Sequence, residues 1–97
     1  MKLFIDDVRN PPSEDYSVVR SSTEAIQWIK DNGTPSFISF DHDLGETDTS
    51  MVFLHRFYNE IWKEGDKIPD YTVHSANPVG SKNIISFMES WKKACQK

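Results

Sequence analysis

The chain has 97 residues, of which 37% are hydrophobic and 12% aromatic, and this composition predicts one packed domain over residues 1–97 rather than a disordered chain. A formal net charge of −4 argues against non-specific DNA binding, which needs a basic face, but leaves room for a small phosphorylated ligand. No apolar run approaches the ~18 residues of a membrane span and no signal-peptide pattern opens the chain, so we expect a cytoplasmic protein without a membrane partner. The one cysteine, Cys95, excludes an intramolecular disulfide and a cysteine-based zinc site.

The first half of the chain predicts two strands and a helix. Residues 2–6 contain the consecutive apolar run LFI, which is typical of a strand that is buried on both faces. The turn signal NPPS separates this strand from a second one at residues 16–20. Ser21 and Glu24 then fit a capping box, and the helix that they open stops at the C-cap pair NG, residues 32–33.

The second half repeats the order of strand and helix twice. Residues 37–40 form the third strand, and Thr49 or Ser50 caps a long helix with apolar residues at helical spacing. Residues 71–74 form the fourth strand, and the last helix begins near Ser81. We expect this helix to bury Ile84, Ile85, Met88 and Trp91.

Strands that alternate with helices predict an α/β fold, a small doubly wound and mostly parallel four-stranded sheet with three main helices covering both of its faces. Only about ten residues, 7–16, join the first two strands, whereas a parallel crossover usually takes a dozen or more. We therefore expect either an irregular, helix-free connection or a second strand that is not parallel.

Acidic side chains follow two of the predicted strands. Asp6 and Asp7 end the first strand, and Asp41 and Asp43 follow the third. Sheets of this class bind ligands outside the carboxyl ends of their strands, so these carboxylates are expected to meet in one crevice. Their mutual repulsion there is relieved by a bound hard cation or by protonation, and ligands that are all oxygen suit Mg²⁺ or Mn²⁺. The alternative is that each aspartate only caps a turn.

Two histidines accompany the acids. His42 and His74 both lie at strand ends, and imidazole titrates near neutral pH, so both are candidates for general acid and base catalysis. His55 lies inside the long helix, and we assign it to the surface.

The segment from His74 to Asn83 runs from a strand end into the start of the last helix, where exposed amides favour a phosphate group. Its alternative role is a helix N-cap that serves only stability. The candidates for phosphate binding are Ser75, Asn77, Asn83 and Arg9, with Arg20 and Lys82 as further cations near the crevice. The alternative role for each of these cations is an ordinary salt bridge to the acidic residues.

The motifs "LFIDDVRNPP", "ISFDHDLG" and "VHSANPVGSKN" resemble the cyclic-phosphate-processing receiver family, an offshoot of the response-regulator receiver domains, from residue 2 to about residue 88. The resemblance implies a truncated receiver, or flavodoxin-like, fold. It implies that Asp6 and Asp7 bind Mg²⁺, that Asp41 matches the phosphoryl-accepting aspartate, and that Asp43 lies where a backbone carbonyl helps to hold the metal. Ser75 matches the hydroxyl residue that contacts the phosphoryl group.

The chain also departs from ordinary receivers. It lacks the fifth strand with its phosphoryl-binding lysine, the first helix is lost, and His42 and His74 are added. The resemblance therefore implies metal-dependent hydrolysis of a cyclic phosphate on RNA ends or nucleotides, with Asp41 as ligand or nucleophile. The alternatives are a degenerate receiver phosphorylated on Asp41 and a non-catalytic module that binds a nucleotide or a protein. The substrate, the metal and the oligomeric state stay open.

Overall fold

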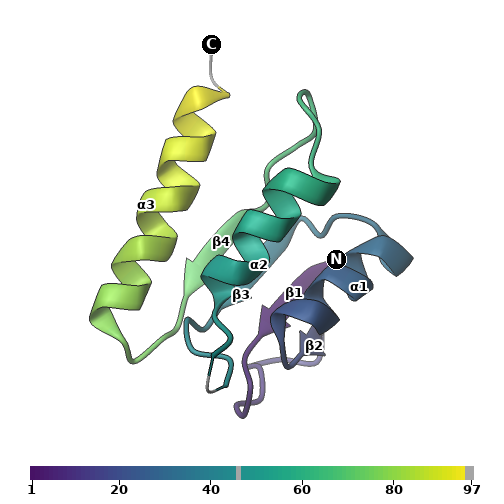
Figure 1. Ribbon diagram of the computed structural model, residues 1–97. Coiled ribbons are helices and arrows are strands. Elements are labelled where there is room, and N and C mark those ends of the chain that lie inside the picture. Colours follow the sequence, from purple (N-terminus) through teal and green to yellow (C-terminus); the bar gives the residue numbers. More distant parts are fainter. Residues whose placement is uncertain (46, 96–97) are drawn as a thin grey trace.

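The computed structural model describes residues 1–45 and 47–95, which form a parallel sheet with helices packed against it (Figure 1). The elements, in chain order, are β1 (Lys2–Ile5), β2 (Tyr16–Val19), α1 (Ser22–Asn32), β3 (Phe37–Phe40), α2 (Ser50–Arg56), the π-helical turn η1 (Phe57–Ile61), β4 (Asp70–Val73) and α3 (Pro78–Ala94).

The sheet has the order β2-β1-β3-β4, and every pair of neighbouring strands is parallel. The chain winds outward from β1 to β2 and then returns past β1 to β3 and β4, so the winding reverses between β1 and β3. The expected small α/β fold with a four-stranded parallel sheet and three helices is confirmed. The register also aligns the strand ends, because Ile5 pairs with both Val19 and Phe40, and Phe40 pairs with Val73. The residues that follow these ends therefore share one edge of the sheet.

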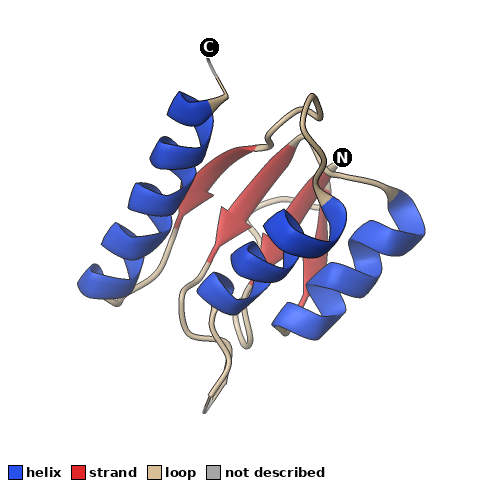
Figure 2. Cartoon of the chain, turned by 45° about the horizontal axis from the view of Figure 1, so that its top comes forward, coloured by secondary structure: helices blue, strands red, loops and turns tan. Residues whose placement is uncertain are grey.

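All three helices contribute to one core on one face of the sheet (Figure 2). Alternate strand residues such as Leu3, Ile5, Ile38 and Phe40 point into that core together with buried residues of α1, α2 and α3. The expectation of helices on both faces is wrong, because the connection from β1 to β2 contains no helix. The connection from β1 to β2 is irregular, as its short length predicted, and β2 is nevertheless parallel to β1.

The opposite side of the sheet, which we call the bare face, carries no helix within residues 1–45 and 47–95. Phe4 is its most buried apolar residue, with 4% of its surface exposed. The ring of His74 stacks on Phe4 at a centroid distance of 4.5 Å, and Tyr16 meets Phe4 edge-on at 5.8 Å. Side chains thus cover the sheet where a helix is missing. The bare face consists of Lys2, Phe4, Tyr16, Val18, Phe37, Ser39, Asp70 and Thr72.

The start of α1 agrees with the predicted cap and adds one partner. Ser21 is the N-cap, and its hydroxyl accepts the amide N–H of Glu24 at 3.1 Å. The Glu24 carboxylate reaches back to the amide of Arg20, at 3.1 Å, instead of that of Ser21. Oδ2 of Asp48 accepts the amide N–H of Ser22 at 2.7 Å, and this bond ties the loop after β3 to α1.

The second and third helices differ from their predicted extents. Thr49 caps α2 as expected, but the helix widens into η1 at Phe57, where the amide of Trp62 bonds to the Phe57 carbonyl at 2.9 Å. α3 begins at Pro78, three residues before Ser81, because Asn77 supplies the N-cap and proline suits the first helical position. Ile85 is 44% exposed and does not belong to the core, contrary to its predicted burial. None of the described helices combines the length and apolarity that a membrane crossing requires.

Candidate metal and phosphate site

The carboxylate of Asp6, directly after β1, is fully buried and turns the chain at the edge of the sheet. Its Oδ1 accepts the amide N–H groups of Val8 at 2.9 Å and Arg9 at 2.8 Å, and its Oδ2 lies 2.9 Å from Nε2 of His74. Burial alone would raise the pKa of the Asp6 carboxyl, but these hydrogen bonds outweigh it and hold the pKa below its usual range. Asp6 is therefore an ionised, oriented group at neutral pH.

Asp41 occupies the matching position after β3, where its amide bonds to the Ile5 carbonyl at 2.9 Å. Burial and the nearby charge of Asp6 raise the pKa of the Asp41 carboxyl above its usual value. The Ser75 hydroxyl, His74 and Arg9 offset part of this effect. This edge of the sheet thus holds more negative charge than its surroundings neutralise.

Asp7 joins these two carboxylates. One oxygen each from Asp6, Asp7 and Asp41 lies within 4.8 Å of the others, and Asp7 is the most exposed of the three. Three carboxylate oxygens at this spacing fit a small hard cation such as Mg²⁺ or Mn²⁺, whose positive charge would also relieve the repulsion at Asp41. Asp43, the expected fourth acid, does not belong to this group among the described residues.

His74 lies beside the carboxylates with both of its ring nitrogens bonded. Nε2 contacts Asp6, and Nδ1 lies 2.7 Å from the hydroxyl of Ser39. Arg9 donates from Nη1 to the His74 carbonyl at 2.7 Å, which places its guanidinium at this edge. Ser39 was not among the residues predicted for this site. The one available signal was a polar residue within the otherwise apolar strand FISF, and that signal does not reveal a partner.

His42 has partners other than those of His74. Its Nδ1 is 3.0 Å from Oδ1 of Asp43, and its ring packs so closely on Gly80 that a Cβ there would lie 2.2 Å from the ring Cγ. Asn77 donates from Nδ2 to Asp43 at 3.3 Å and accepts the Gly80 amide with Oδ1 at 3.0 Å. These four residues connect the loop after β3 to the start of α3, and the hydrogen bonds to His42 and Asn77 lower the pKa of Asp43.

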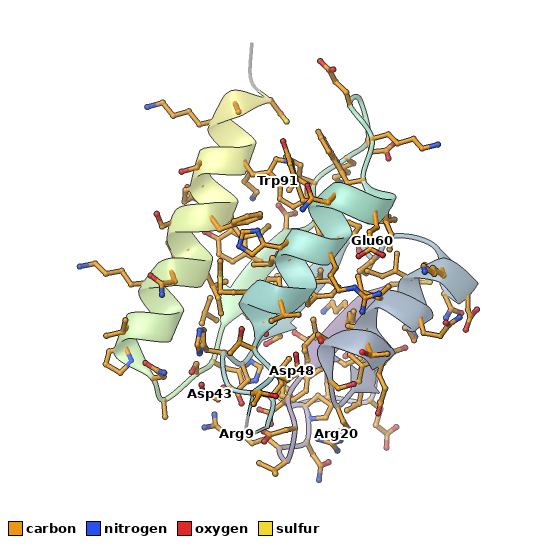
Figure 3. All side chains as sticks on the ribbon, in the orientation of Figure 1. Arg9, Arg20, Asp43, Asp48, Glu60 and Trp91 are labelled. Carbon is orange, nitrogen blue, oxygen red and sulfur yellow. The ribbon has the colours of Figure 1, made fainter. Side chains whose placement is uncertain are left out.

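Of the remaining predicted site residues, some lie at the carboxyl edge of the sheet and others lie outside the site. Ser75 lies near Asp41 and accepts the Asn77 amide at 3.1 Å, so the structure keeps it at the edge. Asn83 lines a separate cavity of about 540 Å³ between α2 and α3, together with His55, and Lys82 is exposed on α3. Arg20 donates to the carbonyls of Asp6 and Arg9, so it holds the connection between β1 and β2. Figure 3 shows Arg9, Arg20 and Asp43 at one end of the molecule.

The parallel sheet, the reversal of winding between β1 and β3 and the acidic group at its carboxyl edge define a small receiver-like α/β domain. The sequence model of one family, described as the cyclic-phosphate processing receiver domain, matches residues 1–90, and the chain belongs to that family. The resemblance drawn from the three motifs is thereby confirmed. Comparison with curated proteins and with solved structures gave no match.

Proposed function

We propose that the chain hydrolyses a cyclic phosphate on an RNA end or a nucleotide, using a divalent cation held by Asp6, Asp7 and Asp41. The observation that carries this proposal is the convergence of three carboxylate oxygens within 4.8 Å, in a member of a family described by cyclic-phosphate processing. A bound Mg²⁺ or Mn²⁺ would supply the positive charge that polarises the phosphoryl group.

The chain's own residues supply binding and orientation. The Arg9 side chain is 48% exposed and lies 3.8 Å from Oδ2 of Asp6, so it can reach a phosphate oxygen from beside the carboxylates. The Ser75 hydroxyl lies near Asp41 and can donate to the same group. In the reaction, the oxygen of water bonds to phosphorus and gives up a proton, the bond from phosphorus to one ribose oxygen breaks, and that ribose oxygen takes up a proton.

The two histidines differ in their fitness to move that proton. Both ring nitrogens of His74 are bonded, whereas His42 uses Nδ1 for Asp43 and has no hydrogen bond at Nε2 within the described part of the chain. We therefore assign proton transfer to His42. Asp41 acts as a metal ligand in this scheme, and its direct attack on phosphorus to form an aspartyl-phosphate is the alternative.

The test is incubation of the pure protein with Mn²⁺ and either 2′,3′-cyclic nucleotides or an oligonucleotide that ends in a 2′,3′-cyclic phosphate. We expect phosphomonoester product, its loss in Asp41→Asn, and full activity in the matched control Asp70→Asn, whose carboxylate lies on β4 and bonds to Lys92. If no such substrate turns over, hydrolysis is wrong. A Mg²⁺-dependent complex of Asp41 with beryllofluoride in the same preparation would then favour the phosphorylated-receiver alternative.

A further inference from the structure

We infer that Ser39 is a positioning residue, which acts through His74 to fix the single oxygen that Asp6 presents to a cation. The inference rests on the cation-binding part of the proposed function. It assigns a role to a buried hydroxyl on the bare face and gives His74 a task other than proton transfer.

The carboxylate of Asp6 has little free capacity for a ligand. Each carboxylate oxygen offers about two acceptor positions. The amides of Val8 and Arg9 fill both positions on Oδ1, and Nε2 of His74 fills one on Oδ2. One position on Oδ2 is left, so Asp6 can bind a cation through one oxygen only. This position is useful only if the carboxylate does not rotate.

The amides hold Oδ1, and His74 fixes the direction of Oδ2, because Asp6, Ser39 and Phe4 hold its ring from three sides. The carboxylate of Asp6 can only accept, so Nε2 of His74 is the donor at 2.9 Å, and Nδ1 is the ring nitrogen that faces Ser39. The hydroxyl of Ser39 lies 2.7 Å from Nδ1, within hydrogen-bond distance, and this contact fixes the orientation of the ring. The stacking of the ring on Phe4, with an interplanar angle of 6°, fixes its tilt.

Ser39 can hold this position because it belongs to the sheet itself. It lies in the middle of β3 and pairs with Phe4 on β1 and with Thr72 on β4. Its surface is 4% exposed, too little for direct contact with a substrate. A hydroxyl on a central strand is more precisely placed than one on a loop, and supporting partners of this kind typically change metal affinity by about 10- to 100-fold.

The experiment measures Mn²⁺ affinity from the electron paramagnetic resonance signal of the free ion, for the wild type, Ser39→Ala and Ser39→Thr. We expect Ser39→Ala to bind about 10-fold more weakly and Ser39→Thr, which keeps the hydroxyl, to recover most of the loss. The matched control is Ser36→Ala, which removes a hydroxyl that bonds to the Met1 carbonyl at the other end of β3, and its affinity should equal that of the wild type. Nitrogen-15 chemical shifts of the His74 ring should differ between the wild type and Ser39→Ala at Nδ1, the nitrogen that loses its partner, more than at Nε2.

A second pair of variants separates positioning from proton transfer. The amide of His74→Gln can still donate to Asp6, whereas His74→Leu cannot, so we expect the first to bind Mn²⁺ more tightly than the second. If the wild type binds Mn²⁺ and Ser39→Ala binds it equally well, the positioning role is wrong and the proposed function stands. If the wild type binds no Mn²⁺, both are wrong.

Discussion

Asp6 and Asp41 follow neighbouring strands, yet their surroundings move the pKa values of the two carboxyl groups in opposite directions. Amide N–H groups and His74 stabilise the ionised carboxylate of Asp6, whereas burial and the negative charge of Asp6 destabilise the ionised carboxylate of Asp41. The pair therefore combines one carboxylate that is stable in its ionised form with one that gains from a cation.

Removing the charge of Asp41 should stabilise the protein when no metal is present. Asp41→Asn removes the repulsion with Asp6 and keeps the size of the side chain, so we expect calorimetry in a chelating buffer to give a Tm several degrees above that of the wild type. In Mn²⁺ the wild type should gain stability and the variant should not. Asp70→Asn serves as the control and should behave like the wild type in both buffers. An unchanged Tm in the chelating buffer would contradict the repulsion.

The contribution of Asp6 to stability should disappear in acid. Its folded pKa lies below the unfolded value near 4, so its stabilisation is complete above about pH 5 and is lost as the pH falls through the folded pKa. We expect Asp6→Asn to lower the free energy of unfolding at pH 7 by about 1–3 kcal/mol, because its amide cannot accept from both His74 and the backbone. Denaturant titrations from pH 7 to 3 should show this difference shrinking.

The pH series is best measured in proteins that also carry Asp41→Asn. The pKa of Asp41 is raised, so its protonation in the wild type adds stability as the pH falls and would mask part of the effect of Asp6. A difference between the Asp6 variants that stays constant down to pH 3 would contradict the lowered pKa.

The convergence of the residues that follow the strand ends could be predicted from the sequence. Parallel strands in register must deliver Asp6, Asp41 and His74 to one edge, so their convergence follows from topology. The role of Ser39 and the direction of the His42 side chain could not be predicted from the sequence. The partner of a side chain depends on which face of the sheet it occupies, and a slip of one residue changes that face.

At the scale of elements, the start of α3 is a close junction between a helix and a loop. Gly80 lies in the first turn of α3 and is buried under the ring of His42. Glycine is unfavourable inside a helix, and its replacement by alanine normally stabilises a protein by up to about 1 kcal/mol. Here the contact with His42 reverses that expectation.

Gly80→Ala should therefore destabilise the protein by about 1–3 kcal/mol, the usual cost of forcing an extra carbon into a packed site. Combining it with His42→Ala should recover most of this loss, which a double-mutant cycle in denaturant measures. Ser90→Ala, farther along α3, is the control for helix propensity and should be neutral or slightly stabilising. Stabilisation by Gly80→Ala alone would show that His42 is free to move.

The differences between predicted and observed helices have local causes. The apolar spacing in α3 begins only at Ile84, so the spacing predicted a helix start that is too late. The helix begins at Pro78 because Asn77 caps it and proline suits its first position. In the second helix the apolar spacing continues past Phe57, although the backbone there adopts η1. Hydrophobic spacing detects an exposed and a buried side but not a change of helix type.

At the scale of the whole molecule, the sheet separates a helix-covered core from the bare face, and Phe4 is the main apolar residue on the bare side. Phe4 touches His74 and Tyr16, so part of the cover of the sheet is a residue of the candidate site. The apolar run in β1 correctly predicted that Phe4 is buried although it points away from the core. Side chains cover Phe4, rather than a helix.

Phe4→Ala should lower the free energy of unfolding by about 3 kcal/mol, the lower end of the usual cost for a buried phenylalanine. Chemical denaturation measures the loss. Val18→Ala is the control on the same face, and it should cost less than about 1 kcal/mol because Val18 is 36% exposed. Equal and small costs for both variants would mean that the bare face contributes little to folding.

The direction of α3 determines which spectroscopic signals can report on the site. α3 starts beside Asp43 and rises about 1.5 Å per residue, so Trp91 lies about 20 Å from the start of the helix (Figure 3). Trp62 packs against Trp91 at 5.2 Å and shares that distant position. The emission of Trp62 and Trp91 would thus change little when a cation or phosphate binds, and titrations that rely on these two tryptophans would miss real binding. The resonances of Tyr16, which meets the Phe4 ring beneath His74, are the more informative probe.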